Sequence, residues 1–171
     1  MIDGTANLLG ALGLAVADRI HQAARDVLNR SGETPAAVIV IGYGQGLSND
    51  NLRRILDLSH PGSVRLVDRL VADGLVERRK GKDRRAVALV LTAKGEAMRE
   101  RMLEGRLASL RPLLAPLTSP QLASLDELLK ELLRSVPESD LERCRICRMC
   151  DDQVCSECPI PAAFKTSDDA K

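Results

Sequence analysis

Apolar residues near the N-terminus recur at the spacing of an α-helix. Between residues 7 and 29 they fall at every third or fourth position, which predicts a long helix with one apolar face. Gly32 is expected to end this helix. Thr34 and Pro35 then suit the N-cap and first turn of a second helix. Residues 36–41 are all apolar, so this second helix is expected to be buried on every side.

Two short helices separated by a tight corner are predicted next. Ser48 is a candidate N-cap for a helix that continues to Leu58. A second helix is expected to begin at His60 and to end at Gly74. Two short helices in this order are typical of a helix-turn-helix. The sequence therefore predicts a helix-turn-helix over residues 48–74.

The second of these helices has an apolar face and an outward face. Core spacing is shown by Leu66, Val67, Leu70 and Val71. We therefore expect Ser63, Arg65 and Arg69 to face outward, because they fall between the core positions. The first turn, which includes His60, is expected to face outward with them. These outward side chains are candidate binding residues.

A hairpin and two further helices follow the helix-turn-helix. The segments LVERR and AVALVLT flank a polar, glycine-containing tip, KGKDRR, and this pattern is typical of a β-hairpin. Thr92 is a candidate N-cap for a helix of about 24 residues. Ser119 and Pro120 suit the start of another helix. The hairpin would form the wing of a winged helix.

The last of these helices carries a stripe of leucines. The stripe consists of Leu122, Leu125, Leu128, Leu129, Leu132 and Leu133. Such a stripe is usually intrachain core, but long helices around a small winged helix leave more apolar surface than it can cover, which favours a homodimer. The expected fold class is mainly α (α+β). It is a winged helix-turn-helix domain over residues 1–136, with a two-stranded β wing and long N- and C-terminal dimerisation helices.

Composition and charge narrow the class of partner. Aromatic residues make up 1% of the chain, which argues against single-strand readers that stack bases on aromatic rings. The net charge is only +1, but residues 60–85 contain eight basic residues against four acidic ones. Because only local Lys and Arg side chains displace counterions from phosphates, this basic stretch favours double-stranded DNA as the partner.

The apolar run from Leu8 to Ala17 bears on the location of the protein. It resembles the core of a signal peptide, but no Lys or Arg precedes it and Asp3 does. It is also too short to span a membrane. We interpret it as the buried face of a first helix in a cytoplasmic protein that has no membrane partner. The cysteines are then expected to be reduced or metal-bound.

Three sub-motifs along the helix-turn-helix and the hairpin carry a family resemblance. They are RLVDRL followed by DGLV in residues 65–76, DRR in residues 83–85, and LTxxG in residues 91–95. Their order and spacing resemble the multiple-antibiotic-resistance regulator (MarR) family of winged helix-turn-helix transcription regulators. The helix order on both sides matches as well. The resemblance therefore covers residues 7–136.

This resemblance implies how the chain would bind DNA. It implies a homodimer whose body is built from helices of both chain ends, with residues 60–73 in the major groove and the wing in the adjacent minor groove. By position, Arg85 would enter the minor groove and Asp83 would brace the wing arginines. A pocket for a small-molecule effector is implied between the dimer body and the DNA-binding lobe. The candidate DNA-binding residues are Arg53, Arg54, His60, Ser63, Arg65, Arg69, Lys82, Asp83, Arg84 and Arg85.

All five cysteines lie in one C-terminal segment, residues 137–171. The candidate metal ligands are Cys144, Cys147, Cys150, Cys155 and Cys158, in the spacing CxxCxxCxxxxCxxC. Two CxxC pairs can supply the four thiolates of a tetrahedral zinc site. The last four cysteines would form that site, with Cys144 left over. The sequence therefore predicts a metal or redox segment.

The chemistry of this segment has two alternatives to zinc. The run CxxCxxC with a later Cys-Pro is similar to the iron-sulfur motif of bacterial ferredoxins, although Cys155 follows after four residues and not three. Unliganded or disulfide-switching thiols are the other alternative. Nearby Arg143, Arg145 and Arg148 would favour thiolates by opposing their charge. Metal loading or oxidation is expected to reorder residues 138–164 against the dimer helices and so change DNA binding.

Catalysis is not expected from this chain. The two histidines, His21 and His60, form no convincing triad with a nucleophile and an acid. The predicted function is therefore a DNA-binding transcriptional regulator that binds palindromic duplex DNA as a homodimer and is modulated by metal or redox state. The alternative is a metal or iron-sulfur carrier, or an electron-transfer module, that uses the winged helix for protein contacts.

Overall fold

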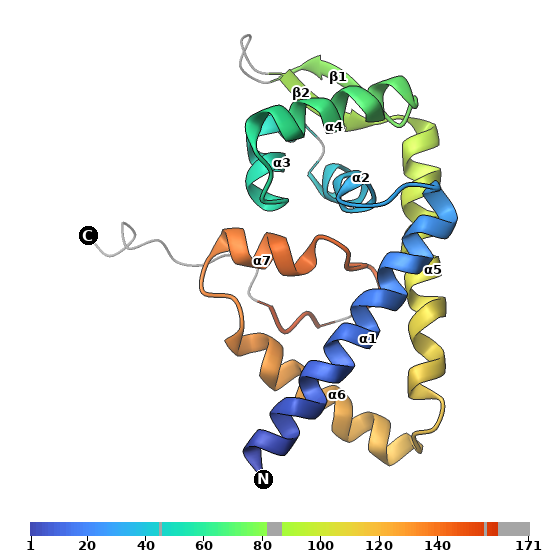
Figure 1. Cartoon of the computed structure of the whole chain (residues 1–171), viewed down its shortest axis with the longest axis vertical. Helices are drawn as coiled ribbons and strands as arrows, with labels where there is room; N and C mark the ends of the chain where they lie inside the picture. The colour runs from blue at the N-terminus through green and yellow to red at the C-terminus, as the bar shows by residue number, and fades with distance from the viewer. Residues whose placement is uncertain (45, 82–86, 156, 161–171) are drawn as a thin grey trace, which may run out of the picture.

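The structure is a computed structural model that describes residues 1–44, 46–81, 87–155 and 157–160. Within these residues the chain is mostly helical, with a two-stranded sheet (Figure 1). The mainly α winged-helix fold expected from the sequence is confirmed. The elements are α1 (Ile2–Leu28), α2 (Thr34–Tyr43), α3 (Asn49–Ile55), α4 (His60–Ala72), β1 (Val76–Lys80), β2 (Val87–Leu91), α5 (Ala93–Leu114), α6 (Ser119–Ser135) and α7 (Asp140–Cys147).

The first helix starts and ends earlier than the apolar pattern indicated. It begins at Ile2, and Asn29 ends it in the left-handed conformation, with φ 49°, where its N–H donates to the carbonyl of Arg25. Asparagine is among the few residues that tolerate this conformation, so it replaces the expected glycine. Gly32 also has a positive φ, 68°, but it lies in the connection to α2.

Helix α2 forms the centre of the hydrophobic core. Its residues from 34 to 41 are buried on all sides, as the unbroken apolar run predicts. The helix contacts α1, α3, α5 and β2, and Figure 1 shows it end-on in the middle of these elements. The fully buried side chains around it include Leu52, Leu70, Leu89 and Met102. The helix-turn-helix and the wing therefore pack on the same hydrophobic core.

The wing begins at a close approach between its first strand and α5. Strands β1 and β2 pair antiparallel, with Val76 opposite Leu91 and Lys80 opposite Val87. The hydroxyl of Thr92 accepts from the N–H of Gly95 and donates to the carbonyl of Gly74. A Cβ on Gly95 would lie 2.1 Å from the carbonyl oxygen of Leu75. Only glycine therefore allows α5 to start this close to the wing.

Helix α6, the start of α1 and the end of α5 form the lower part of the molecule in Figure 1, away from the wing. Helices α1 and α5 pack along each other. The leucines near the start of α1 are exposed, and Leu8 is 70% exposed. The expectation that this run is buried is therefore wrong for a single chain. None of the described helices is both long and apolar enough to cross a membrane.

The C-terminal segment folds back toward the helix-turn-helix. Residues 140–147 form α7, a helix that the sequence analysis did not predict because the segment lacks an apolar face. Helix α7 contacts α3, and it lies below α3 in Figure 1. Beyond it, Met149 packs against the hydrophobic core and Ile160 is buried. The described part of the segment, up to residue 160, is thus docked on the rest of the chain.

Candidate nucleic-acid interface and cysteine segment

Helices α3 and α4 each begin at a serine cap. The hydroxyl of Ser48 accepts from the N–H of Asn51, at 3.1 Å, and the hydroxyl of Ser59 accepts from the N–H of Gly62, at 3.2 Å. Each bond satisfies an N–H that the helix start leaves without a partner. The Ser48 cap and the start of α4 at His60 were predicted from the sequence. The Ser59 cap was not predicted.

Ser63 has a structural position, and the prediction that it faces outward is wrong. Its side chain is 0% exposed. Its hydroxyl donates to the carbonyl of His60, at 3.0 Å, and accepts from Nδ2 of Asn49, at 3.1 Å. The spacing explains the error, because Ser63 precedes Leu66 and Val67 by three and four residues and so lies on their face. Ser63 therefore joins α3 to α4.

The outward face of α4 and the first strand of the wing present basic side chains to solvent. The exposed basic residues on these two elements are His60, Arg65, Arg69, Arg78, Arg79 and Lys80. Arg78 forms an ion pair with Asp68 of α4, and Arg79 forms one with Glu77 of its own strand. The first pair ties the wing to α4. Arg65 and Arg69, four residues apart, share the outward face of α4, and Arg78 of the wing is paired with Asp68 of that helix.

The candidate residues of α3 differ from each other in their contacts. Arg53 is half-buried and forms an ion pair with Asp50, with 2.8 Å between Nη2 and Oδ1. Arg54 is exposed. The remaining candidates, at the tip of the wing, lie outside the described residues. They are Lys82, Asp83, Arg84 and Arg85.

Two cations that sequence reasoning missed hold the end of α4. Nη2 of Arg30 lies 3.1 Å from the carboxylate of Asp73, and Nζ of Lys94 donates to the Asp73 carbonyl at 2.8 Å. Positive charge at a helix C-terminus is stabilising because the last carbonyls carry partial negative charge. No periodicity singles out Arg30 or Lys94, since they come from the α1–α2 connection and from α5.

The five cysteines are partly gathered by local structure. Cys144 and Cys147 lie one turn apart on α7, and the N–H of Cys150 donates to the carbonyl of Cys147 at 2.8 Å. Cys155 and Cys158 are exposed, and none of the five thiols forms a disulfide. Among the described residues, no three His, Cys, Asp or Glu side chains are arranged to hold a metal ion. The described thiols therefore do not form a ready-made metal site in this conformation.

The arginines near the cysteines do not dominate the thiol chemistry. Burial raises the pKa of the Cys147 and Cys150 thiols. Arg143 opposes this shift at Cys147, and Arg106 of α5 opposes it at Cys150, both with smaller effect. The expectation that arginines favour thiolates holds in sign for Arg143, but burial outweighs it at both thiols. A cation would have to deprotonate these side chains in order to bind them.

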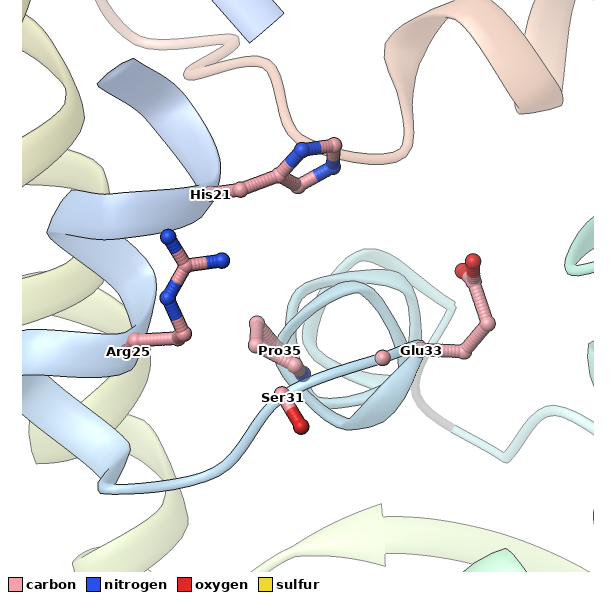
Figure 2. Close-up of a pocket in the computed structure, with 6 residues that line it drawn as sticks. His21, Arg25, Ser31, Glu33 and Pro35 are labelled. Carbon is pink, nitrogen blue, oxygen red and sulfur yellow. The ribbon is translucent and has the colours of Figure 1, made fainter. Parts of the chain in front are cut away.

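A small recess lies between α1 and the start of α2. Its volume is about 220 Å³, and Figure 2 shows His21 and Arg25 of α1 on one side and Pro35 of α2 on the other. Ser31, Gly32 and Glu33 complete the lining. The recess is smaller than the 300–1,000 Å³ that is usual for ligand pockets. Only a compact molecule would fit.

The winged-helix region of this chain is similar to known proteins. Residues 36–86 match the model of the MarR family. No protein in a curated set matches the chain. Among solved structures, RV1404 from Mycobacterium tuberculosis is 17% identical, with a TM-score of 0.72, and covers 81% of this chain and 96% of its own. The reduced form of MarR from E. coli is 26% identical, with a TM-score of 0.60 and coverages of 73% and 96%.

A third similar structure is that of the Mycobacterium tuberculosis MarR family protein Rv2887. Its complex with DNA is 21% identical to this chain, with a TM-score of 0.60, and the match covers 74% of this chain and 95% of Rv2887. Its complex with salicylic acid is 25% identical, with a TM-score of 0.57 and coverages of 73% and 93%. The matched proteins are transcription regulators and not enzymes, as expected for this chain. Residues 36–86 thus carry the MarR-family signature, and the chain has the winged-helix fold of MarR-family regulators.

Proposed function

We propose that this protein is a transcriptional regulator that binds palindromic duplex DNA as a homodimer in the cytoplasm. The observation that carries the proposal is the pair of exposed arginines, Arg65 and Arg69, which lie one turn apart on α4. An α-helix fits the major groove, and arginines on it can contact phosphates and base edges. The similarity to Rv2887, which was solved with DNA, supports this assignment.

The candidate residues divide into three groups under this proposal. Arg65 and Arg69, with His60 at the helix start, would meet the major groove. Arg54 of α3 would meet a flanking phosphate. The tip of the wing, with Lys82, Asp83, Arg84 and Arg85, would reach the minor groove, where a narrow groove attracts arginine. Ser63 is excluded from the interface because it is buried.

The homodimer is supported by apolar surface on two helices. Leu8 and Leu14 of α1 are strongly exposed, and so are Leu128 and Leu132 of α6. Helix α6 has no buried residue within the chain. Large exposed apolar patches on a protein surface commonly mark interaction sites. A second copy of the same chain would cover both helices, and a two-fold dimer would place two α4 helices on successive turns of DNA.

Selection from a pool of random duplexes tests this proposal. The full chain is expected to enrich a palindromic sequence, and the variant Arg65→Ala/Arg69→Ala is expected to lose the enrichment. Arg101→Ala, a change at an exposed position of α5 far from α4 in sequence, is the control and should enrich the same sequence as the wild type. Failure of the wild type to enrich any duplex would favour the alternative, a metal or electron carrier that uses the winged helix for protein contacts.

We further propose that a metal or the redox state at the cysteines modulates DNA binding. The spacing of Cys147, Cys150, Cys155 and Cys158 suits zinc or an iron-sulfur cluster, because thiolates bind both. Purification without oxygen, followed by an optical spectrum and elemental analysis, distinguishes the two. A brown protein with iron and sulfide indicates a cluster, and a colourless protein with one zinc per chain indicates a zinc site. A protein with neither would leave thiol oxidation as the modulating chemistry.

A small-molecule effector is the last element of the proposal. In the recess, Arg25 supplies a cation that could pair with a compact carboxylate, and Glu33 lines the same recess. The similar protein Rv2887 was solved with salicylic acid. Salicylate is expected to raise the melting temperature of the wild type and to lose this effect in Arg25→Ala. An equal shift in both proteins would contradict the assignment of the recess.

A further inference from the structure

The first observation is that the C-terminal segment caps the helix that precedes the helix-turn-helix corner. Helix α3 ends at Ile55, so the carbonyl of Arg54 lacks a partner within the helix. Arg145 of α7 supplies that partner, with Nη2 at 3.1 Å and Nε at 3.4 Å from the carbonyl oxygen. Ninety-one residues separate donor and acceptor. The end of α3 is therefore completed from the far end of the chain.

The same arginine also holds the corner itself. Nη2 of Arg145 lies 3.0 Å from Oδ1 of Asp57, which adopts a positive φ of 55° in the turn between α3 and α4. A non-glycine residue in this conformation is unfavourable by itself and depends on its surroundings. Arg145 thus makes two contacts: it caps the end of α3, and it forms a charge-assisted hydrogen bond with Asp57 at the corner. One side chain fixes both features.

The second observation is that Arg145 lies inside the cysteine spacing. It follows Cys144 directly, and Cys147 lies two residues further on the same helix. In the turn after α7, the N–H of Cys150 donates to the carbonyl of Cys147, so the third thiol stays close to the end of the helix. The neighbouring Met149 packs against the core. The first three thiols therefore lie on α7 or in the turn that follows it, close in sequence to Arg145.

We propose that a thiophilic metal centre at the cysteines locks α7 in place and that Arg145 transmits this to the helix-turn-helix corner. This inference rests on the proposed function for its effect on DNA, and it names the route of the regulation. Helix α7 has eight residues and none of them is buried. Arg145 contacts α3 and the corner, and Met149, just beyond the helix, packs against the core. A short helix held at so few points gains order from any further link. Bonds from four thiolates to one centre would supply that order. The metal-loaded protein then has a pre-organised corner and binds duplex more tightly.

Two variants separate the metal centre from its coupling. Arg145→Ala removes both contacts to the corner and keeps all five cysteines. Asp57→Asn weakens the contact from the other side, and it leaves α7 untouched and retains a residue that tolerates positive φ. Asp140→Asn is the matched control, because Asp140 lies on the same helix and pairs with Arg143 of that helix, not with the corner. Cys147→Ser/Cys150→Ser removes the centre.

Hydrogen exchange at the amides of residues 56–58 tests the coupling without DNA. The full chain is studied with and without its metal, using Zn²⁺ alone or Fe²⁺ with sulfide under anaerobic conditions. Loading is expected to slow exchange at these amides in the wild type and in Asp140→Asn. In Arg145→Ala the same amount of metal should bind per chain, but exchange at the corner should no longer respond. An unchanged response in Arg145→Ala, or a wild type that takes up neither metal, would overturn the proposal.

Duplex affinity tests the consequence for DNA. Removal of the metal is expected to weaken wild-type binding by about fivefold or more, the lower end of typical coupling between two sites. Arg145→Ala and Cys147→Ser/Cys150→Ser should bind with the weaker affinity in both states, with Asp57→Asn in between. Equal or tighter wild-type binding after metal removal would contradict the inference. If no protein binds duplex while exchange still responds to metal, the proposed function fails and the coupling stands.

Discussion

The winged helix and the C-terminal segment of this protein are held together by different forces. The winged helix surrounds α2, whose residues from 34 to 41 are all buried. In contrast, α7 has no buried residue, and Arg145 links it to α3 and the corner by hydrogen bonds and an ion pair. The apolar contacts of the segment lie beyond the helix, at Met149 and Ile160. Apolar burial acts without any ligand, whereas a polar dock of this kind is weak until something else orders it. The comparison explains why we assign regulation to the segment and DNA recognition to the winged helix.

The largest expected effect is a loss of stability in the winged helix, the region that apolar burial holds together. In Gly95→Ala the new Cβ would meet the carbonyl of Leu75, so either α5 or the wing must shift. The free energy of unfolding is expected to fall by about 3 kcal/mol, the upper range for overpacking. Gly105→Ala in the same helix is the control, since its Cβ would make ordinary contacts and the substitution favours the helix. Urea unfolding measures both, and equal stabilities would contradict the packing.

The next effect concerns apolar surface that a single chain leaves exposed. Leu128 of α6 is 63% exposed, and a dimer would bury it. Leu128→Asp is expected to cost about 2 kcal/mol of association, the range for one buried leucine, and so to shift dimer dissociation by more than tenfold. Light scattering over a dilution series measures it. Ser124→Asp, off the stripe on the same helix, should leave the dimer intact; if both variants behave like the wild type, α6 is not at the interface.

A smaller effect separates packing from DNA contact at Ser63. Ser63→Ala would leave Nδ2 of Asn49 without its hydrogen bond in a partly buried position. Stability is expected to fall by about 1–2 kcal/mol, the cost of an unsatisfied buried donor. The salt dependence of duplex binding should stay at the wild-type value, because Ser63 contacts no phosphate in this account. A shallower salt dependence in Ser63→Ala would show that Ser63 contacts DNA after all.

The smallest expected effect lies in the C-terminal segment. The ion pair of Arg145 is partly exposed, with 38% of the Arg145 side chain and 85% of the Asp57 side chain accessible to solvent. Solvent screens such a pair, so Arg145→Ala is expected to lower the unfolding free energy of the metal-free chain by less than about 1 kcal/mol. Thermal unfolding measures this. A loss as large as that of Gly95→Ala would show that the segment is part of the core, and the contrast between the two regions would disappear.

The same contrast explains what the sequence could predict. The buried helix α2, the Ser48 cap and the paired strands of the wing follow from apolar runs and capping residues, which burial and local hydrogen bonds enforce. Ser63 was assigned to the wrong face because its residue type outweighed its spacing from Leu66. Helix α7 was missed because it has no apolar face to produce a period. Its anchor, Arg145, depends on a contact across 91 residues that no local pattern shows.

Duplex binding by the full chain as a function of salt concentration tests the central claim most directly. The account predicts that affinity falls steeply as salt rises, and that Arg65→Ala and Arg69→Ala each reduce the slope of log K against log salt by about one if the lost contact is to a phosphate. Arg101→Ala should keep the wild-type slope. Wild-type binding that is absent, or that does not change with salt, would contradict the assignment of this winged helix to DNA.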